Sequence, residues 1–186
     1  LLGKPDIGLV SAREMIERAS QIVTAVGDTP LIADGDNGYG DEQAVAELVN
    51  AYEQAGVQCI QLEDQVSPKR CGHMDNKEVI DLKEAVAKLA IAARSRNSDQ
   101  FLIVARTDSR ATHDLDEALR RGEVFLNAGA DILFIEAPQS VDEMQVIKRS
   151  FPETVLVANM VEDGKTPELT TTELAELGYQ LILRPV

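Results

Sequence analysis

The sequence predicts an α/β fold, a (β/α)8 barrel of the TIM type of which only about six βα units are present in this chain. Three observations support this architecture. Short apolar runs rich in Val, Ile and Leu alternate with segments whose apolar residues recur at helical spacing. The runs lack the polar alternation of half-exposed strands, which is typical of parallel strands buried on both faces. Each run is also followed by polar or charged residues, and in a barrel such residues gather at one mouth.

The expected strands are residues 30–33, 57–62, 101–105, 132–135, 155–158 and 181–183. Amphipathic helices are expected between them, the first carrying its apolar stripe on Met15, Ile16, Ala19, Ile22, Val23 and Val26. Capping-box patterns mark three helix starts, at Ser11 with Glu14, Ser140 with Glu143, and Thr170 with Glu173. Glycines mark the helix ends, where a positive φ is favoured, at Gly27, Gly56, Gly129 and Gly178.

The residues after the strands favour a closed barrel over an open sheet. They are Asp34 and Asp36, Glu63 and Asp64, Arg106 and Asp108, Glu136, Asn159, and Arg184. In a barrel these positions converge, whereas in an open sheet they would lie along a line. No G-x-G-x-x-G or Walker pattern follows any strand. Residues 1–186 are expected to form one partial barrel domain, and a chain that opens Leu-Leu-Gly-Lys-Pro without Met is expected to be a piece of a longer protein.

The composition excludes several classes of protein. Lys and Arg number 18 and Asp and Glu 32, which gives a net charge of −14 and argues against nucleic-acid or anionic-membrane partners. A small anionic substrate stays possible, because a metal or a few cations can reverse the field locally. No apolar run approaches the ~20 residues of a membrane span. With only Cys59 and Cys71, and no signal peptide, a cytoplasmic protein is expected. His73 and His113 are not grouped, which argues against a zinc site.

The acids after the first two strands form a candidate metal site. Asp34 and Asp36 are two residues apart, so on a strand both carboxylates point to the same side. With Glu63 from the next strand they give a set of oxygen ligands without histidine, which suits Mg²⁺, with Mn²⁺ possible. The alternative is that these acids are helix caps and solvated loop residues.

Two further positions carry candidate chemistry. Cys71 stands in the polar run Pro68-Lys-Arg-Cys-Gly-His73, where neighbouring cations stabilise a thiolate; the alternative is an inert small hydrophobe, which is our interpretation of Cys59. Arg106 ends a buried strand, and its guanidinium fits a substrate carboxylate; the alternative is a structural pair with Asp108 or Glu136. Asn159 and Thr166 are weaker candidates for polar contacts to a ligand.

Four motifs in one order resemble the isocitrate lyase/phosphoenolpyruvate mutase superfamily over essentially the whole chain. They are Asp34-Gly-Asp-Asn-Gly-Tyr-Gly40, Gln61-Leu-Glu-Asp-Gln65 with Lys69-Arg-Cys-Gly-His73, Ala105-Arg-Thr-Asp108, and Ala158-Asn-Met-Val-Glu162 with Lys165-Thr-Pro167. The Lys-Arg-Cys-Gly-His stretch resembles the signature of the carbon–carbon lyase branch, which contains methylisocitrate and dimethylmalate lyases. The chain has Glu162-Asp-Gly-Lys165 where methylisocitrate lyases are expected to have Glu-Phe-Gly.

The resemblance implies a role for each matching residue. It places catalysis on Cys71, Lys69, His73 and Arg106, and substrate binding on Gly72, Glu136, Asn159 and Thr166. It places Mg²⁺ on Asp34, Asp36 and Glu63, with Asp6 supporting the metal through water. It also implies two further strands at the start of the fold, helices exchanged between subunits at its end, and a homotetramer.

The implied reaction is the Mg²⁺-dependent cleavage of a 2-hydroxy di- or tricarboxylate. The products are a 2-keto acid, pyruvate or glyoxylate, and a carboxylate such as succinate or propionate. The alternatives are hydrolysis or decarboxylation of oxaloacetate at the same metal site and phosphonate P–C bond chemistry, against which the Cys71 motif argues. A binding or structural protein that has lost catalysis is a further alternative.

Overall fold

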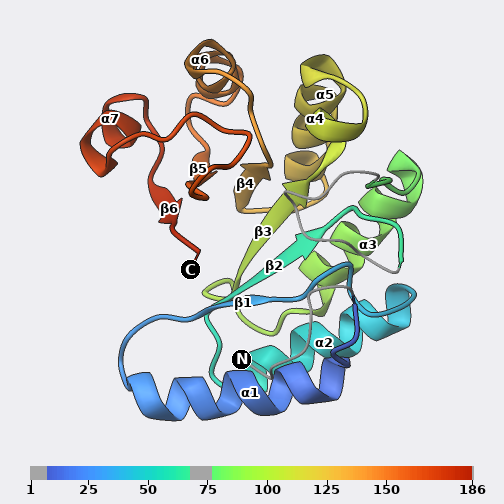
Figure 1. Ribbon diagram of the computed structural model, residues 1–186. Helices are drawn as coiled ribbons and strands as arrows, with labels where there is room; N and C mark the ends of the chain where they lie inside the picture. Colours follow the sequence, from blue (N-terminus) through green and yellow to red (C-terminus); the bar gives the residue numbers. More distant parts are fainter. Residues whose placement is uncertain (1–7, 68–76, 186) are drawn as a thin grey trace.

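The computed structural model describes residues 8–67 and 77–185. Six parallel strands form a single sheet in the order of the chain, and the sheet curls into a half-barrel (Figure 1). The strands are β1 (Ile32–Asp34), β2 (Cys59–Glu63), β3 (Leu102–Thr107), β4 (Ile132–Ile135), β5 (Val155–Asn159) and β6 (Leu181–Leu183). The expectation of six parallel strands rather than a closed eight-stranded barrel is confirmed.

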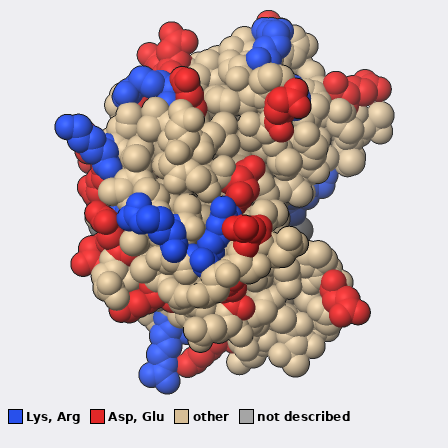
Figure 2. Space-filling view, turned by 180° about the vertical axis from the view of Figure 1, so that it is seen from behind, with Lys and Arg blue, Asp and Glu red and all other residues tan. Residues whose placement is uncertain are grey.

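Helices lie around the outside of the curled sheet (Figure 1). They are α1 (Ala12–Val26), α2 (Glu42–Gln54), α3 (Leu82–Ser95), α4 (Ser109–Thr112), α5 (Leu115–Asn127), α6 (Val141–Ser150) and α7 (Thr171–Glu176). In the described part of the chain, no helix combines the length and the apolar composition that crossing a membrane requires. Acidic and basic side chains lie next to one another in several places on the face seen in Figure 2.

Two of the three capping-box predictions are confirmed, and one is wrong. Ser11 with Glu14 and Thr170 with Glu173 form the reciprocal pair of hydrogen bonds. Ser140 accepts from the Glu143 amide, but the Glu143 carboxylate binds Arg110 and the Gln139 amide instead of returning to Ser140. A charged partner from another element therefore outcompetes the local cap. The single-turn helix α4 was not predicted.

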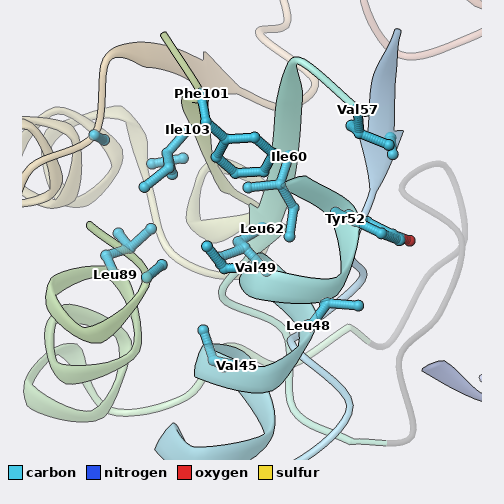
Figure 3. Packing of buried hydrophobic residues seen from close by; sticks show 14 of the residues in the cluster. Val45, Leu48, Val49, Tyr52, Val57, Ile60, Leu62, Leu89, Phe101 and Ile103 are labelled. Carbon is cyan, nitrogen blue, oxygen red and sulfur yellow. The ribbon is translucent and has the colours of Figure 1, made fainter. Parts of the chain in front are cut away.

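The pleat of the strands divides their side chains between two faces. Ile60, Leu62, Ile103 and Ala105 belong to the outer core against α2, α3 and α5 (Figure 3). The alternate positions pack together on the inner face, where Cys59, Val104, Ile132, Phe134 and Val157 form a separate apolar cluster. The strand registers place Glu63 beside Arg106 and Arg106 beside Phe134, so the inner face turns polar toward the carboxyl ends of the strands.

A tight turn follows β1 and fixes the first acids of the site. The Asp34 side chain accepts a hydrogen bond from the Asp36 amide at 2.9 Å, and Gly38 N donates to the Gly35 carbonyl. Asp36 takes a positive φ of 46°, which Asp tolerates better than most residues. The buried Tyr52 of α2 donates its hydroxyl to the Asp34 carbonyl at 2.7 Å, so the turn is also held from the helix that follows it.

We predict that Gly38→Ala destabilises the protein more than Gly27→Ala. Both glycines have a positive φ, for which an alanine costs about 1–3 kcal/mol. A Cβ at Gly38 would also collide with Val45 of α2, whereas nothing lies within 4 Å of a Cβ at Gly27. Overpacking of this kind adds about 1–3 kcal/mol. Urea unfolding of the two variants measures the difference, and Val45→Ala in the Gly38→Ala background should recover part of it. Equal losses at both glycines would contradict the packing of this turn.

Candidate functional site

Charged and polar side chains meet at the carboxyl ends of β2 to β5 on the inner face. Arg106 Nε lies 3.5 Å from Glu63 Oε2, and Arg106 Nη2 lies 3.8 Å from Glu136 Oε1. Asn159 Nδ2 is 3.4 Å from both oxygens of Glu136. The guanidinium lies over the Phe134 ring, 5.0 Å from its centroid. Four of the sequence-predicted site residues are therefore in one group, although they are up to 96 positions apart in the chain.

Arg106 has its shortest contacts with Asp108 on the same strand end. Its Nε and Nη2 donate to the two Asp108 oxygens at 3.0 and 3.1 Å, as a bidentate pair. Burial by itself lowers the pKa of Arg106, but Asp108, Glu136 and Glu63 outweigh it and raise that pKa well above the ordinary value. The structural pairing considered for Arg106 is thus present. Among the described residues these contacts use Nε and Nη2, so Nη1 is the nitrogen left to meet a bound anion.

Asp36 and Glu63 are buried acids joined through the backbone. The expectation that Asp34 and Asp36 point to the same side of a strand is wrong, because β1 ends at Asp34 and Asp36 lies in the turn with a positive φ. Glu63 N donates to the Asp36 carbonyl at 2.9 Å, and both residues are 7% exposed, whereas Asp34 is exposed. Burial raises the pKa of Tyr39, and the charges of Asp36 and Asp34 raise it further. Burial also raises the pKa of Tyr52, and the charges of Asp34 and Asp36 raise it further. Negative charge is thus concentrated at this turn.

Residues 8–67 and 77–185 contain no group of three or more His, Cys, Asp or Glu side chains close enough together to hold a metal ion by themselves. The donor set nevertheless fits Mg²⁺, which keeps several waters and binds through one or two carboxylates. Among the described residues, Arg106 and Lys77 are the cations that pair with Asp108, Glu63 and Glu136. Asp36, whose backbone carbonyl accepts from the Glu63 amide, adds another acid at these strand ends, and a divalent cation would offset part of the negative charge of Asp36 and Glu63.

A cleft of about 710 Å³ opens beside Asp36. Asn37 and Tyr39 line it on the side of the β1 turn, and Gln65 and Asp81 on the side of the β2–α3 connection. Asp36 therefore lines this cleft and is joined to Glu63 through the backbone.

A second layer of polar residues holds the strand ends from outside. Asp64 accepts hydrogen bonds from the Thr107 hydroxyl at 2.7 Å, from the Asp108 amide at 3.0 Å and from Arg121 at 2.9 Å. Burial raises the pKa of Asp64 even though these donors and the charge of Arg121 lower it. Sequence reasoning missed the role of Arg121. The signal was available, because Arg121 lies at helical spacing between Ala118 and Phe125 on the buried stripe of α5.

Lys77 was also missed, and the sequence carries no signal for it. It stands in the polar run Asp75-Asn-Lys-Glu78, which is typical of a solvated loop. In the structure its side chain is 2% exposed, and Nζ lies 2.6 Å from Asp108 Oδ1. A lysine is buried in this way only where a carboxylate meets it, and that carboxylate is distant in sequence.

The other predicted site residues are placed as follows. Thr166 is buried in the connection between β5 and α7. Asp6, Lys69, Cys71, Gly72 and His73 lie outside the described residues. Cys59 is buried in the inner cluster, and burial raises the pKa of its thiol to about 12, in agreement with its interpretation as an inert residue. Arg184 is exposed and pairs with Glu168 rather than joining the mouth.

Comparison with known proteins gives a family match and close relatives. The family model described as phosphoenolpyruvate phosphomutase matches residues 1–184. The 2,3-dimethylmalate lyase of Eubacterium barkeri is 49% identical over 184 residues, which are 99% of this chain and 63% of that protein. A probable 2-methylisocitrate lyase of Corynebacterium glutamicum is 41% identical over 185 residues, which are 100% of this chain and 60% of that protein. The chain thus spans less than two thirds of the length of these relatives.

Solved structures give the same result. A 2,3-dimethylmalate lyase has a TM-score of 0.96 at 34% identity, with 99% of this chain and 62% of that chain covered. An oxaloacetate acetylhydrolase bound to 3,3-difluorooxalacetate has a TM-score of 0.94 at 30% identity, with 98% and 63% covered. A phosphonopyruvate hydrolase bound to oxalate and Mg²⁺ has a TM-score of 0.81 at 31% identity, with 97% and 62% covered. The chain therefore belongs to the phosphoenolpyruvate mutase/isocitrate lyase superfamily.

Proposed function

We propose that the protein carrying this chain is a Mg²⁺-dependent carbon–carbon lyase that cleaves a 2-hydroxy di- or tricarboxylate into a 2-keto acid and a smaller carboxylate. The observation that carries the proposal is the group at the mouth, where Arg106 lies between Glu63 and Glu136 above an apolar floor. A guanidinium can bind one carboxylate of such an acid, and a cation held by neighbouring carboxyl groups can bind its other end. The relatives named as lyases support this reaction class.

Asp36 and Glu63, which are joined through the backbone, would hold the metal ion, and Asp34 and Asp6 are the candidates for supporting it through water. When bound, Mg²⁺ supplies Lewis-acid stabilisation of negative charge on the oxygens of the fragment that becomes the 2-keto acid. The Mg²⁺ in the related phosphonopyruvate hydrolase structure supports this choice of ion. Mn²⁺ has similar ligand preferences and is the second candidate.

Arg106 would bind the carboxylate of the departing fragment. Its Nη1 can donate to that carboxylate while Nε and Nη2 remain on Asp108. When the C–C bond breaks, its electron pair moves to the α-carbon of this fragment, and the resulting enolate spreads charge onto the carboxylate oxygens. A donor held in place before the reaction stabilises that charge without having to reorganise.

Cys71 would complete the reaction by protonating the α-carbon of the departing fragment. The 2-hydroxyl group would give its proton to water as it becomes the keto group, and a proton from water would restore the Cys71 thiol. The thiol is flanked in sequence by Lys69, Arg70 and His73, which favour the thiolate and make the proton easier to transfer. Gly72 is proposed to contact the substrate in the same segment. Glu136, Asn159 and Thr166 are proposed to contact the substrate from the strand ends.

A 2,3-dimethylmalate-like acid is the preferred substrate class, supported by the 49% identity to a lyase of that name. Oxaloacetate hydrolysis is the second candidate, and the likeness to oxaloacetate acetylhydrolase favours it. Phosphonate chemistry is the third, supported by the phosphonopyruvate hydrolase structure. We also propose that the protein is cytoplasmic and forms a homo-oligomer, a tetramer by resemblance to the family. Light scattering would measure the number of subunits.

The proposed function is tested with a panel of 2,3-dimethylmalate, methylisocitrate, isocitrate, oxaloacetate and phosphonopyruvate. Pyruvate and glyoxylate are detected by coupled assays, with Mg²⁺ or with EDTA. We expect Mg²⁺-dependent release of a 2-keto acid from one of the 2-hydroxy acids. Oxalate and acetate from oxaloacetate alone would favour the second candidate, and turnover of none of the five would contradict an enzymatic role in this class.

We predict that Asp36→Asn abolishes Mg²⁺-dependent turnover while the protein stays folded. The amide keeps the shape of the side chain, and Asn tolerates the positive φ of Asp36, but the anionic metal ligand is lost. The matched control is Asp41→Asn, in the same connection, where Asn still caps α2. Asp41→Asn should retain activity. Full turnover by Asp36→Asn would remove Asp36 from the metal site.

We predict that Cys71→Ser lowers kcat by about 10²–10⁴-fold, the usual contribution of a general acid–base group. The serine keeps the shape, but its pKa lies far above neutral, so it cannot donate and regain a proton near pH 7. Steady-state kinetics measure the loss, and Cys59→Ala, which changes the buried thiol of β2, should keep kcat. A kcat near that of the wild type in Cys71→Ser would favour the hydrolase candidate, in which the metal and water act without the thiol.

A further inference from the structure

The Arg106 guanidinium is surrounded by three carboxyl groups that compete for it. Asp108 holds it at 3.0 and 3.1 Å, Glu63 lies at 3.5 Å and Glu136 at 3.8 Å. Arginine binds carboxylates best in a bidentate arrangement, and Asp108 is the acid that has this arrangement here. If Asp108 did not occupy Nε and Nη2, the nearest partners for these donors would be Glu63 and Glu136.

Asp108 is itself fixed from two sides. Its Oδ1 also accepts from Lys77 Nζ at 2.6 Å, and its backbone amide donates to Asp64 Oδ1 at 3.0 Å. The Asp108 side chain is fully buried, at 0% exposure. Burial raises the pKa of this carboxyl, but Arg106 and Lys77 outweigh it and lower the pKa below its ordinary value. The acid that holds Arg106 is therefore an anion with little freedom to move.

Fold stability alone does not account for this arrangement. Replacing a buried ion pair by apolar residues of similar volume is often neutral or stabilising. Arg106 has two other acids within 4 Å, so Asp108 and the buried Lys77 are not needed to give the guanidinium a partner. The arrangement sets which acid receives Arg106 as its bidentate partner.

We propose that Asp108, with Lys77 as its counter-ion, is a positioning residue that keeps Arg106 from closing onto Glu63 and Glu136. This inference rests on the proposed function, because it assigns Glu63 to the metal and Glu136 and Arg106 to the substrate. In Asp108→Asn the neutral amide offers one acceptor oxygen in place of two, so it cannot form the bidentate pair with Nε and Nη2, and Arg106 turns toward Glu63 and Glu136 and competes with the cation for them.

The test measures the Kd for Mn²⁺ by electron paramagnetic resonance on the protein that carries this chain. Four proteins are compared with the wild type: Asp108→Asn, Lys77→Met, the double variant with both changes, and Asp131→Asn. Asp108→Asn alone leaves the Lys77 ammonium buried without its carboxylate and could unfold the protein. The double variant removes that ammonium as well, so the loss of Asp108 can be measured in a folded protein. Asp131→Asn is the matched control, since Asp131 pairs with Arg96 at 2.6 Å at the opposite ends of the strands.

We expect Asp108→Asn and the double variant to bind Mn²⁺ about 10–100-fold more weakly, the usual effect of losing a partner that orients the ligands of a metal. Lys77→Met retains the bidentate pair but removes one of the two contacts that fix Asp108, so it should weaken Mn²⁺ binding less than Asp108→Asn does. Asp131→Asn should bind Mn²⁺ as the wild type does. A purely structural role would leave the Mn²⁺ affinity of the folded variants unchanged, and that result overturns the inference.

The remaining outcomes separate the inference from the proposed function. Mn²⁺ binding by the wild type without turnover of any panel substrate would contradict the proposed reaction, while the comparison of variants still decides the role of Asp108. A wild type that does not bind Mn²⁺ would contradict the proposed metal site and, with it, the role given to Asp108.

Discussion

A buried guanidinium that must be shared among several acids is the constraint on which the mouth of this half-barrel depends. The Arg106 side chain is 11% exposed. Burying its charge without a partner would cost more free energy than the rest of the fold could offset. It is stabilised by an acid within 4 Å from each of three strand ends. Glu63 is the last residue of β2, and Asp108 and Glu136 directly follow β3 and β4. The strand registers that align Glu63 with Arg106 and Arg106 with Phe134 are thus tied to the charge balance of the site.

The same constraint extends outward from the mouth. Asp108 is held by Lys77 and, through its amide, by Asp64, which is in turn held by Thr107 and Arg121. These contacts connect the ends of β2 and β3 to α5 without passing through the apolar core. Buried networks of this kind are rigid when every member has its partners, and rigidity is what a site needs if its donors are to be in place before a reaction begins.

The fold could be predicted from the sequence because its strands and helices carry local signals. The apolar runs predicted all six strands to within about two residues at either end. Capping residues at the helix starts and glycines at the helix ends predicted most of the helices. The grouping of Glu63, Arg106, Glu136 and Asn159 could be predicted because parallel strands bring their carboxyl ends together. Lys77 and the choice of Asp108 as the partner of Arg106 could not, since they depend on distances between residues that are far apart in the chain. The capping box predicted for Ser140 and Glu143 was wrong for the same reason, because the Glu143 carboxylate binds Arg110, which lies 33 positions away in the chain.

We propose that the carboxyl ends of β1 and β2 hold a divalent cation next to Arg106. Anomalous diffraction from a crystal grown with Mn²⁺ and oxalate tests this site most directly. We expect one strong Mn²⁺ peak beside the carboxylates of Asp36 and Glu63, with oxalate on the side that faces Arg106. A Mn²⁺ peak elsewhere in the molecule, or oxalate bound without Mn²⁺ at this mouth, would contradict it.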